Sequence, residues 1–322
     1  SIASEIDESS TSLAPPKSGE RRFRFGIVPT YIASMLADED TNTKLSAVEK
    51  LKSIIEKMNA EEQAKLLPHL HSFFVVLGNV LNDLNFKVVV LSLDVLRITI
   101  NRLKGSIEAH LQQVMSLLSR QFGNQKSIVK QLVMLSCTDL FRHLNPKTVV
   151  AVLCVFLEHR NSRVREEVLN ILTVALLSTP TGKMNLSAVA NLLVPRLVDP
   201  KRRVRLAAFE LLSSLAVQMN GKVEPIMKIV REFEKKDNEG LAAAVTSRLK
   251  RSSLPRIRYD GLLEYSTPPL TDSSFDVDES ALLLPENLDL HWILYSNGTA
   301  KDDVSPTVFV AFKGGVKATL TQ

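Results

Sequence analysis

Few residues in this chain have the types and spacing that catalysis or metal binding requires. His69 and His71 are two positions apart, which directs them to different faces of a helix, and no cysteine or acidic cluster stands near them to complete a metal site. The sequence contains no glycine-rich phosphate loop and no serine within a G-x-S-x-G turn. Cys137 and Cys154 lie in apolar stretches, which favours buried thiols over a disulfide and fits a reducing compartment. We therefore expect no catalysis, no cofactor and no bound metal.

Basic side chains at short polar turns are the stronger candidates, because they suit the binding of an acidic partner. The whole chain has 40 basic and 35 acidic residues. Of these, residues 1–22 hold three basic and four acidic residues, and residues 252–322 hold five basic and ten acidic residues. Residues 23–251 then hold 32 basic and 21 acidic residues, a net charge of +11. The basic groups cluster at two turns, the first flanked by Arg160, Arg163 and Arg165 and the second by Lys201, Arg202, Arg203 and Arg205.

These charges also have a structural explanation. Polar turns are commonly charged because they are wet, and arginines that follow the turns, such as Arg165 and Arg205, could form ion pairs with a neighbouring helix. Nucleic acid is a weaker candidate partner, because its binders usually add aromatic stacking groups, and the aromatic residues here (6%) fall mostly at apolar positions. The partner class stays open at this point.

The elements that must position these turns are helices. In residues 87–103 the apolar side chains Val88, Leu91, Val95 and Ile98 recur at spacings of three and four, which lays one stripe along a helix. Residues 163–178 and 203–218 carry the same kind of stripe. Each stripe begins with a valine that follows a polar turn, and these valines recur every 35 to 41 residues at Val88, Val129, Val164 and Val204.

A period near 40 with two helices per unit is typical of HEAT or armadillo arrays, in which each helix pair buries its apolar face against its neighbours. We predict an all-α solenoid of about six pairs, with Pro68 and Pro195 bending the helices in which they fall. The predicted first helices are residues 27–38, 61–82, 107–121, 146–158, 186–198 and 223–235. The predicted second helices are residues 43–58, 87–103, 127–143, 163–178, 203–218 and 239–251.

The ends of the chain differ in composition from this region. Residues 1–22 are rich in Ser, Glu and Pro and are expected to form a flexible lead-in, and residues 252–322 an acidic, largely irregular tail. The stretches 288–295 and 307–312 alternate weakly and could be a strand, a docking segment or nothing ordered, and disorder or loose packing is favoured. No apolar run approaches the roughly 18 residues that span a bilayer, so we expect no membrane association. Because the first residue is Ser1 rather than Met, we expect a fragment of a longer protein, monomeric in this form.

The residues now support a resemblance. The six pairs, with second helices that read VREEVLNIL at 164–172 and VRLAAFELL at 204–212, resemble the TOG domains of microtubule polymerases, CLASP proteins and the ciliary crescerins. The stretch 44–51 is similar to the first second helix of a TOG domain, and 159–166 to the fourth turn. The resemblance covers residues 23–251 and is nearest in character to the crescerins.

This resemblance implies a paddle of six HEAT repeats whose intra-repeat loops bind αβ-tubulin or the microtubule lattice, in the cytoplasm and cytoskeleton or at the cilium, axoneme or basal body. The usual exposed Trp of the first loop falls at Thr41, and the single Trp of the chain, Trp292, is in the tail. This departure favours lattice binding, or weak binding assisted by sister domains, over tight binding of free tubulin. A general HEAT scaffold for another acidic partner is the alternative. The expected contact residues are Thr41, Asn42, Lys44, Asn85, Lys87, Lys126, Arg160, Arg163, Arg165, Lys201, Arg202 and Arg203.

Overall fold

The computed structural model describes residues 22–180, 182–234, 238–251 and 253–266. Within this part of the chain the elements are helices and two short β-hairpins. Contacts between residues divide the chain into two compact units, 1–91 and 92–322, and the boundary falls inside helix α5 (Phe86–Leu103). The residues of 1–21 and 267–322, including 288–295 and 307–312, lie outside the described ranges.

The first unit begins with a hairpin, not with the predicted helix at 27–38. Strands β1 (Phe23–Arg24) and β2 (Val28–Pro29) pair antiparallel and lead into the short helix α1 (Thr30–Met35). The turn of this hairpin places Phe25 and Gly26 at positive φ, and a Cβ on Gly26 would come within 2.7 Å of the Lys65 carbonyl oxygen. Phe25 is buried edge-to-face against Phe73. The hairpin therefore covers the first apolar face of the solenoid.

The remaining helices of the first unit follow the predicted pairs. Helix α2 (Thr41–Lys57) packs on α1, and its apolar stripe is buried. The helix predicted at 61–82 is broken into α3 (Ala60–Leu66), η2 (Leu67–His69) and α4 (Leu70–Leu81), with Pro68 in the 3-10 turn. Proline lacks the amide hydrogen that an α-helix needs at an interior position, and the predicted bend is confirmed.

Residues 60–81 differ from the expectation that no apolar run approaches membrane-spanning length. By length and composition this segment is long and apolar enough to cross a membrane. In the structure its apolar side chains Leu66, Leu70, Phe73, Phe74 and Leu77 are instead buried in the first unit. The break at η2 and this one-sided burial indicate a helix of the protein core.

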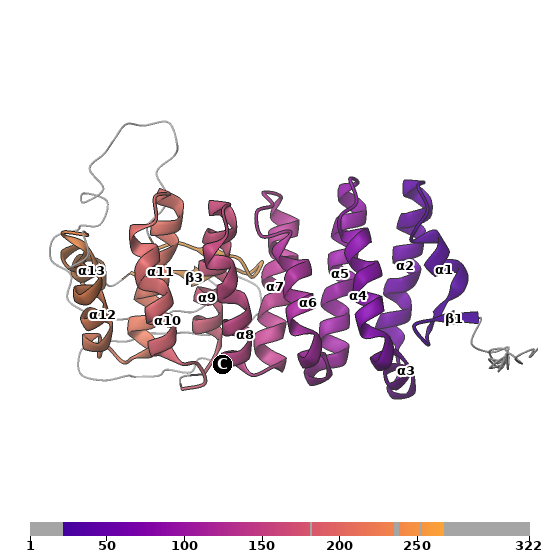
Figure 1. Ribbon diagram of the computed structural model, residues 1–322, viewed down its shortest axis with the longest axis horizontal. Coiled ribbons are helices and arrows are strands. Elements are labelled where there is room, and N and C mark those ends of the chain that lie inside the picture. The colour runs from indigo at the N-terminus through magenta and orange to yellow at the C-terminus, as the bar shows by residue number, and fades with distance from the viewer. Residues whose placement is uncertain (1–21, 181, 235–237, 252, 267–322) are drawn as a thin grey trace, which may run out of the picture. The chain divides into compact units, whose positions relative to one another are not determined.

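The second unit is a regular stack of helix pairs that follow one another in chain order (Figure 1). The first helices are η3 (Lys104–His110) with α6 (Leu111–Ser119), α8 (Pro146–Cys154) with η4 (Val155–Glu158), α10 (Leu186–Leu193) with η5 (Val194–Val198), and α12 (Glu224–Glu234). The second helices are α7 (Ser127–His143), α9 (Ser162–Ser178), α11 (Arg202–Gln218) and α13 (Leu241–Leu249). Pro195 lies in η5, so this predicted bend is also confirmed. The described chain is thus an all-α solenoid of six HEAT pairs, as the stripes predicted.

Packed structure continues beyond the expected boundary at Arg251. Strands β3 (Arg256–Ile257) and β4 (Leu263–Glu264) pair antiparallel, and Arg256 forms a two-pronged ion pair with Glu264 across the hairpin, at 2.7 and 3.0 Å. We call residues 253–266 the strap. It lies across the second helices, since Gly261 lies against Leu135 of α7, and Tyr265 donates a hydrogen bond to Asn170 of α9 at 2.7 Å.

The end of the strap is held by a buried ion pair between α11 and α13. The Ser266 hydroxyl donates to the carboxylate of Glu210 at 2.8 Å, and the Arg248 guanidinium donates to the same hydroxyl at 2.9 Å and to Ser213 at 2.8 Å. Glu210 and Arg248 are both almost fully buried, and their closest charged atoms are 3.4 Å apart. Buried charges are tolerated when they are paired and hydrogen-bonded, and the strap supplies part of that bonding.

Candidate protein-interaction edge

The expected contact residues lie in the turns between the two helices of each pair, which we call the intra-pair turns, or near the start of the helix that follows each turn. In the first unit these turns are residues 36–40 and 82–85. Asp40 caps α2 by accepting hydrogen bonds from the amide and hydroxyl of Thr43, at 2.7 and 2.9 Å. Lys44 donates to Asp83 at 2.7 Å, and this hydrogen bond lowers the pKa of Asp83 below its ordinary value. The ion pair holds the two turns side by side.

The expected contact residues of the first unit differ in exposure. Asn42 and Lys87 are exposed, whereas Thr41, Lys44 and Asn85 are half-buried. Two of these side chains also stabilise the fold. Lys44 forms the ion pair with Asp83, and Asn85 accepts a hydrogen bond from the Lys87 amide at 2.8 Å at the start of α5.

Sequence reasoning missed the character of these two turns. The first turn carries three exposed acidic residues, Asp38, Glu39 and Asp40, so the edge of this unit is not uniformly basic. In the second turn Leu84 is completely exposed, at 104% of its reference area. A leucine inside a short polar turn, in the run Asp83-Leu84-Asn85, was the available signal. This exposed leucine gives an otherwise polar turn one apolar side chain that a partner could cover.

In the second unit the intra-pair turns are built alike, with a small polar side chain that accepts from the amide two residues later. Asn124 accepts from Lys126, Asn161 from Arg163 and Asp199 from Lys201, at 3.0, 3.0 and 2.9 Å. Such turns satisfy the free amides at the start of a helix. The basic residue that follows each acceptor is thereby placed at the first turn of α7, α9 or α11.

Contacts show that these three turns are neighbours. A Cβ on Gly123 would come within 3.1 Å of the Asn161 side chain, and the rings of Phe122 and Phe156 pack edge-to-face at 5.9 Å. Arg196 of η5 donates to the Leu157 carbonyl at 3.1 Å and pairs with Glu158. The turns at 120–126, 159–161 and 199–201 therefore form one continuous edge of the second unit, which we call the basic edge.

Arg165 was expected to contact the partner, but the structure gives it a different role. Its guanidinium grips Asp199 with two hydrogen bonds of 2.8 and 2.9 Å and donates to the His159 carbonyl at 2.7 Å. Burial alone raises the pKa of Asp199, but the hydrogen bonds from Arg165 and from the Lys201 amide outweigh it and lower the pKa. Arg165 is buried and joins two turns, as in the ion-pair alternative, so its side chain is not presented to a partner. Arg205 likewise donates to the Asp199 carbonyl at 2.8 Å.

The other basic residues of this list lie on the surface of the edge. Lys126, Arg160, Lys201 and Arg203 are exposed, and Arg163 and Arg202 are half-buried. Arg203 lies 3.4 Å from Glu166. Arg160, Lys201 and Arg202 have no acidic partner among the residues that the structure describes. This edge therefore presents positive charge that the fold does not neutralise.

Within the described ranges, no three His, Cys, Asp or Glu side chains come together in a way that could hold a metal ion. His69 and His71, the pair considered in the sequence, are both exposed. The basic edge offers positive charge, and the turn at 82–85 of the first unit offers the exposed side chain of Leu84; both are means of protein recognition.

A helical solenoid whose intra-pair turns form an edge of this kind is a TOG-type HEAT array. The model of the CLASP N-terminal family matches residues 32–233, and the chain belongs to that family. It is 52% identical over 311 residues to the crescerin-like protein che-12 of Caenorhabditis elegans. It is 37% identical over 281 residues to the TOG array regulator of axonemal microtubules protein 1 of Homo sapiens. These alignments cover 96% and 86% of this chain, but it spans only 24% and 16% of the relatives' lengths.

Solved structures agree with this assignment. A structure presented as "Crescerin uses a TOG domain array to regulate microtubules in the primary cilium" matches with a TM-score of 0.68 at 35% identity. The match covers 78% of this chain and all of that chain. The MAST/Orbit N-terminal domain matches with a TM-score of 0.56 at 19% identity, over 67% of this chain and 94% of that one, which supports the fold alone.

Proposed function

We propose that this chain is a binding module for αβ-tubulin or the microtubule lattice, and that it contacts its partner through the intra-pair turns. The observation that carries the proposal is the basic edge, where three contacting turns present Lys126, Arg160, Arg163, Lys201, Arg202 and Arg203. Positive charge held at fixed spacing on a rigid edge suits an extended acidic protein surface and speeds encounter with it.

The relatives support this partner and its location. The crescerin structure is described as regulating microtubules in the primary cilium, and the human relative is named a regulator of axonemal microtubules. The relatives are also much longer than this chain. We therefore propose a cytoskeletal and ciliary module that works beside other domains of a longer protein.

The first unit contributes a different kind of contact. It lacks an aromatic side chain at Thr41, and its first turn is acidic, but the second turn presents the exposed Leu84 together with Asn85 and Lys87. A single leucine is a smaller anchor than a tryptophan. We propose modest affinity for one tubulin unit, raised by neighbouring domains or by a lattice that offers many sites.

A general scaffold would bind its partner along the helix faces rather than along this edge. In the second unit the strap crosses α7, α9 and α11. Its Tyr265 and Ser266 form hydrogen bonds with the side chains of Asn170 and Glu210 on that face. Occupation of this face by the chain itself favours the edge as the binding surface.

The test is a charge reversal at the basic edge. The double variant Lys201→Glu with Arg202→Glu should lower co-sedimentation with microtubules by about tenfold or more, because it turns two attractive charges into repulsive ones. The helical signal in circular dichroism should not change, since Lys201 is exposed and Arg202 is half-buried without an ion pair that the structure describes.

The matched control reverses two lysines away from the intra-pair turns. Lys147 and Lys228 are exposed near the starts of α8 and α12, at the other end of their helix pairs. Lys147→Glu with Lys228→Glu makes the same change in net charge and should retain most of the binding. If both double variants lost microtubule binding equally, net charge alone would explain the loss, and the proposal that the basic edge is the binding surface would be refuted.

A further inference from the structure

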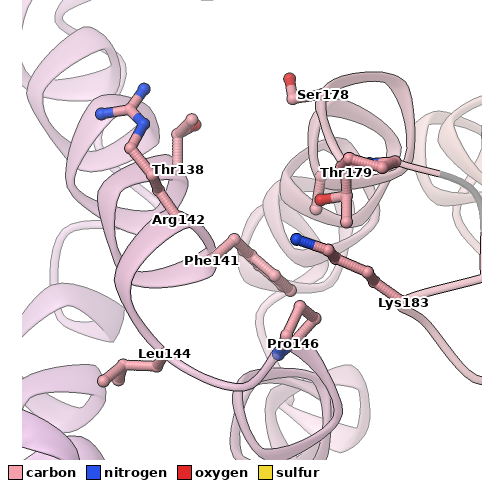
Figure 2. Close-up of a pocket in the computed structure, with 10 residues that line it drawn as sticks. Thr138, Phe141, Arg142, Leu144, Pro146, Ser178, Thr179 and Lys183 are labelled. Atoms are coloured by element: carbon pink, nitrogen blue, oxygen red, sulfur yellow. The ribbon is translucent and has the colours of Figure 1, made fainter. Parts of the chain in front are cut away.

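A pocket of about 210 Å³ opens where α7 and α9 end, away from the basic edge. Figure 2 shows Phe141, Pro146 and the Lys183 side chain meeting at its centre, with Thr138 and Arg142 on one side and Ser178 and Thr179 on the other. Leu135, which lies against Gly261 of the strap, precedes Thr138 and Arg142 by three and seven residues, so these side chains share one face of α7. The pocket and the strap therefore lie along the same face.

The pocket combines an apolar floor with a cationic rim. Phe141, Leu144 and Ala175 form buried parts of the floor. Arg142 and Lys183 are exposed at the rim, and the half-buried Thr179 also lines the pocket. Arg142 pairs with the buried Asp139, whereas Lys183 has no acidic partner in the described part of the chain. Such a site suits a peptide with an aromatic or aliphatic side chain flanked by carboxylates.

We propose that the occupant is the chain's own acidic segment, residues 272–279, with Phe275 on the floor and the flanking carboxylates at Arg142 and Lys183. The segment reads DSSFDVDE, so Phe275 is followed by Asp276, Asp278 and Glu279. Residues 267–300 contain six acidic residues and no Lys or Arg. The charge of this segment complements that of the rim.

The strap ends within reach of the pocket, so the segment that follows it can extend to the pocket. Tyr265 is hydrogen-bonded to Asn170 of α9, and Ser178 at the pocket is eight residues further along that helix, a rise of about 12 Å. Ser266 is the last described residue, and the nine residues to Phe275 can span up to about 30 Å when extended. Tethering at this length also raises the local concentration of the segment at the pocket. This inference does not depend on binding to tubulin.

Disulfide trapping in the full chain tests the proposal. The pair Ser178→Cys with Ser274→Cys keeps both rim cations and all four acidic residues of 272–279. The native thiols should not interfere, because burial raises the pKa of Cys154 to about 12 and raises the pKa of Cys137 as well. We expect an intramolecular disulfide, identified by mass spectrometry after brief mild oxidation at low protein concentration.

The matched control moves the first cysteine by one repeat. Lys222 follows α11 as Lys183 follows α9, it is exposed, and α11 is the helix to which Ser266 is bound. Lys222→Cys with Ser274→Cys therefore tests tethering without the pocket. The Ser178 pair should close about tenfold faster than the Lys222 pair, a ratio equivalent to about 1.4 kcal/mol of docking free energy.

Two further variants separate docking from proximity. In the Ser178 pair, Phe275→Ser and, separately, Lys183→Glu should slow closure to the rate of the control pair. Equal rates for the Ser178 and Lys222 pairs, or rates that neither variant changes, would overturn the proposal. A disulfide-linked dimer as the main product would overturn docking within one chain and would indicate that the segment binds the pocket of a second copy.

Discussion

Leu84 shows at the scale of one residue how a turn can be prepared for a partner. Its neighbours hold the turn, since Asp83 pairs with Lys44 and accepts from the Asn85 amide at 2.7 Å. The leucine itself makes no contribution to the core, because its side chain is fully exposed. A side chain of this kind loses solvent only when a partner arrives.

Leu84→Ala should therefore lower affinity for microtubules by about fivefold, corresponding to about 1 kcal/mol of binding free energy, with no change in the denaturation midpoint. Co-sedimentation and urea denaturation provide the two measurements. Tyr259→Ala is the control, because Tyr259 is equally exposed, at 97%, but stands on the turn of the strap. A loss of stability in the Leu84 variant would assign the residue to folding instead.

Glu167 shows the opposite case, an ionisable group that is buried in the fold. Burial raises its pKa to about 7, although nearby Lys130 and a hydrogen bond from Asn170 oppose the shift. Between its ordinary pKa of 4.5 and about 7 the folded chain holds a proton that the unfolded chain has released. Stability then falls as pH rises through this window, by up to about 3 kcal/mol.

Glu167→Gln removes this penalty and should raise the melting temperature at pH 8 but not at pH 4. Thermal denaturation at a series of pH values measures the difference, and Glu232→Gln, on the exposed surface of α12, is the control. A gain of the same size at both ends of the pH range would show that ionisation of Glu167 is not its cause.

At the scale of elements, the sequence predicts most of the helices because their stripes are regular. Pro68 and Pro195 also fix local breaks, since the effect of a missing amide hydrogen does not depend on tertiary context. The two hairpins were missed because their strands have two residues each, too few to show alternation. The strap depends on long-range partners such as Glu210 and Asn170, which no local pattern reveals.

The candidate edge was predictable in outline but not in detail. The recurrent turns predicted the basic cluster. For Arg165, however, the sequence allowed either contact with a partner or an ion pair within the fold, and only the hydrogen bonds to Asp199 decide between these roles. For Leu84 the polar neighbours Asp83 and Asn85 were a signal, but they do not reveal how far the side chain is exposed. Which side of a turn faces solvent is a property of the packed array.

Arg165→Ala tests the assigned role of this ion pair. Removal of the arginine leaves Asp199 buried without its main partner, which should destabilise the chain by about 3 to 5 kcal/mol. Arg163→Ala, two residues earlier and half-buried, should cost little stability but should weaken binding. Urea denaturation and co-sedimentation together measure both effects. A stable Arg165 variant with weakened binding would return this residue to the contact list.

At the scale of the whole molecule, charge is distributed unequally between the units. The intra-pair turns of the first unit are partly acidic and carry Leu84, and those of the second unit are basic. Binding by the basic edge should weaken as salt screens its charges, whereas an apolar contact is less sensitive. The proposed function thus predicts a graded dependence on ionic strength.

Raising salt from about 0.05 to about 0.3 M should lower co-sedimentation of the unmodified chain, with a shallower salt dependence for the Lys201→Glu, Arg202→Glu variant. Leu84→Ala should lower affinity at every salt concentration and leave the slope unchanged. Identical slopes for the unmodified chain and the double reversal would contradict the role given to the basic edge.

The strap has a consequence for how this solenoid loses its structure. In a linear array each repeat touches only its immediate neighbours, so the ends can fray one pair at a time. The strap instead contacts α7, α9, α11 and α13, which belong to four successive pairs. Release of the terminal helix α13 would remove the bonds of Arg248 to Glu210 and to Ser266, and so weaken the attachment of the strap to α11 as well. These four pairs should therefore melt as a single cooperative block.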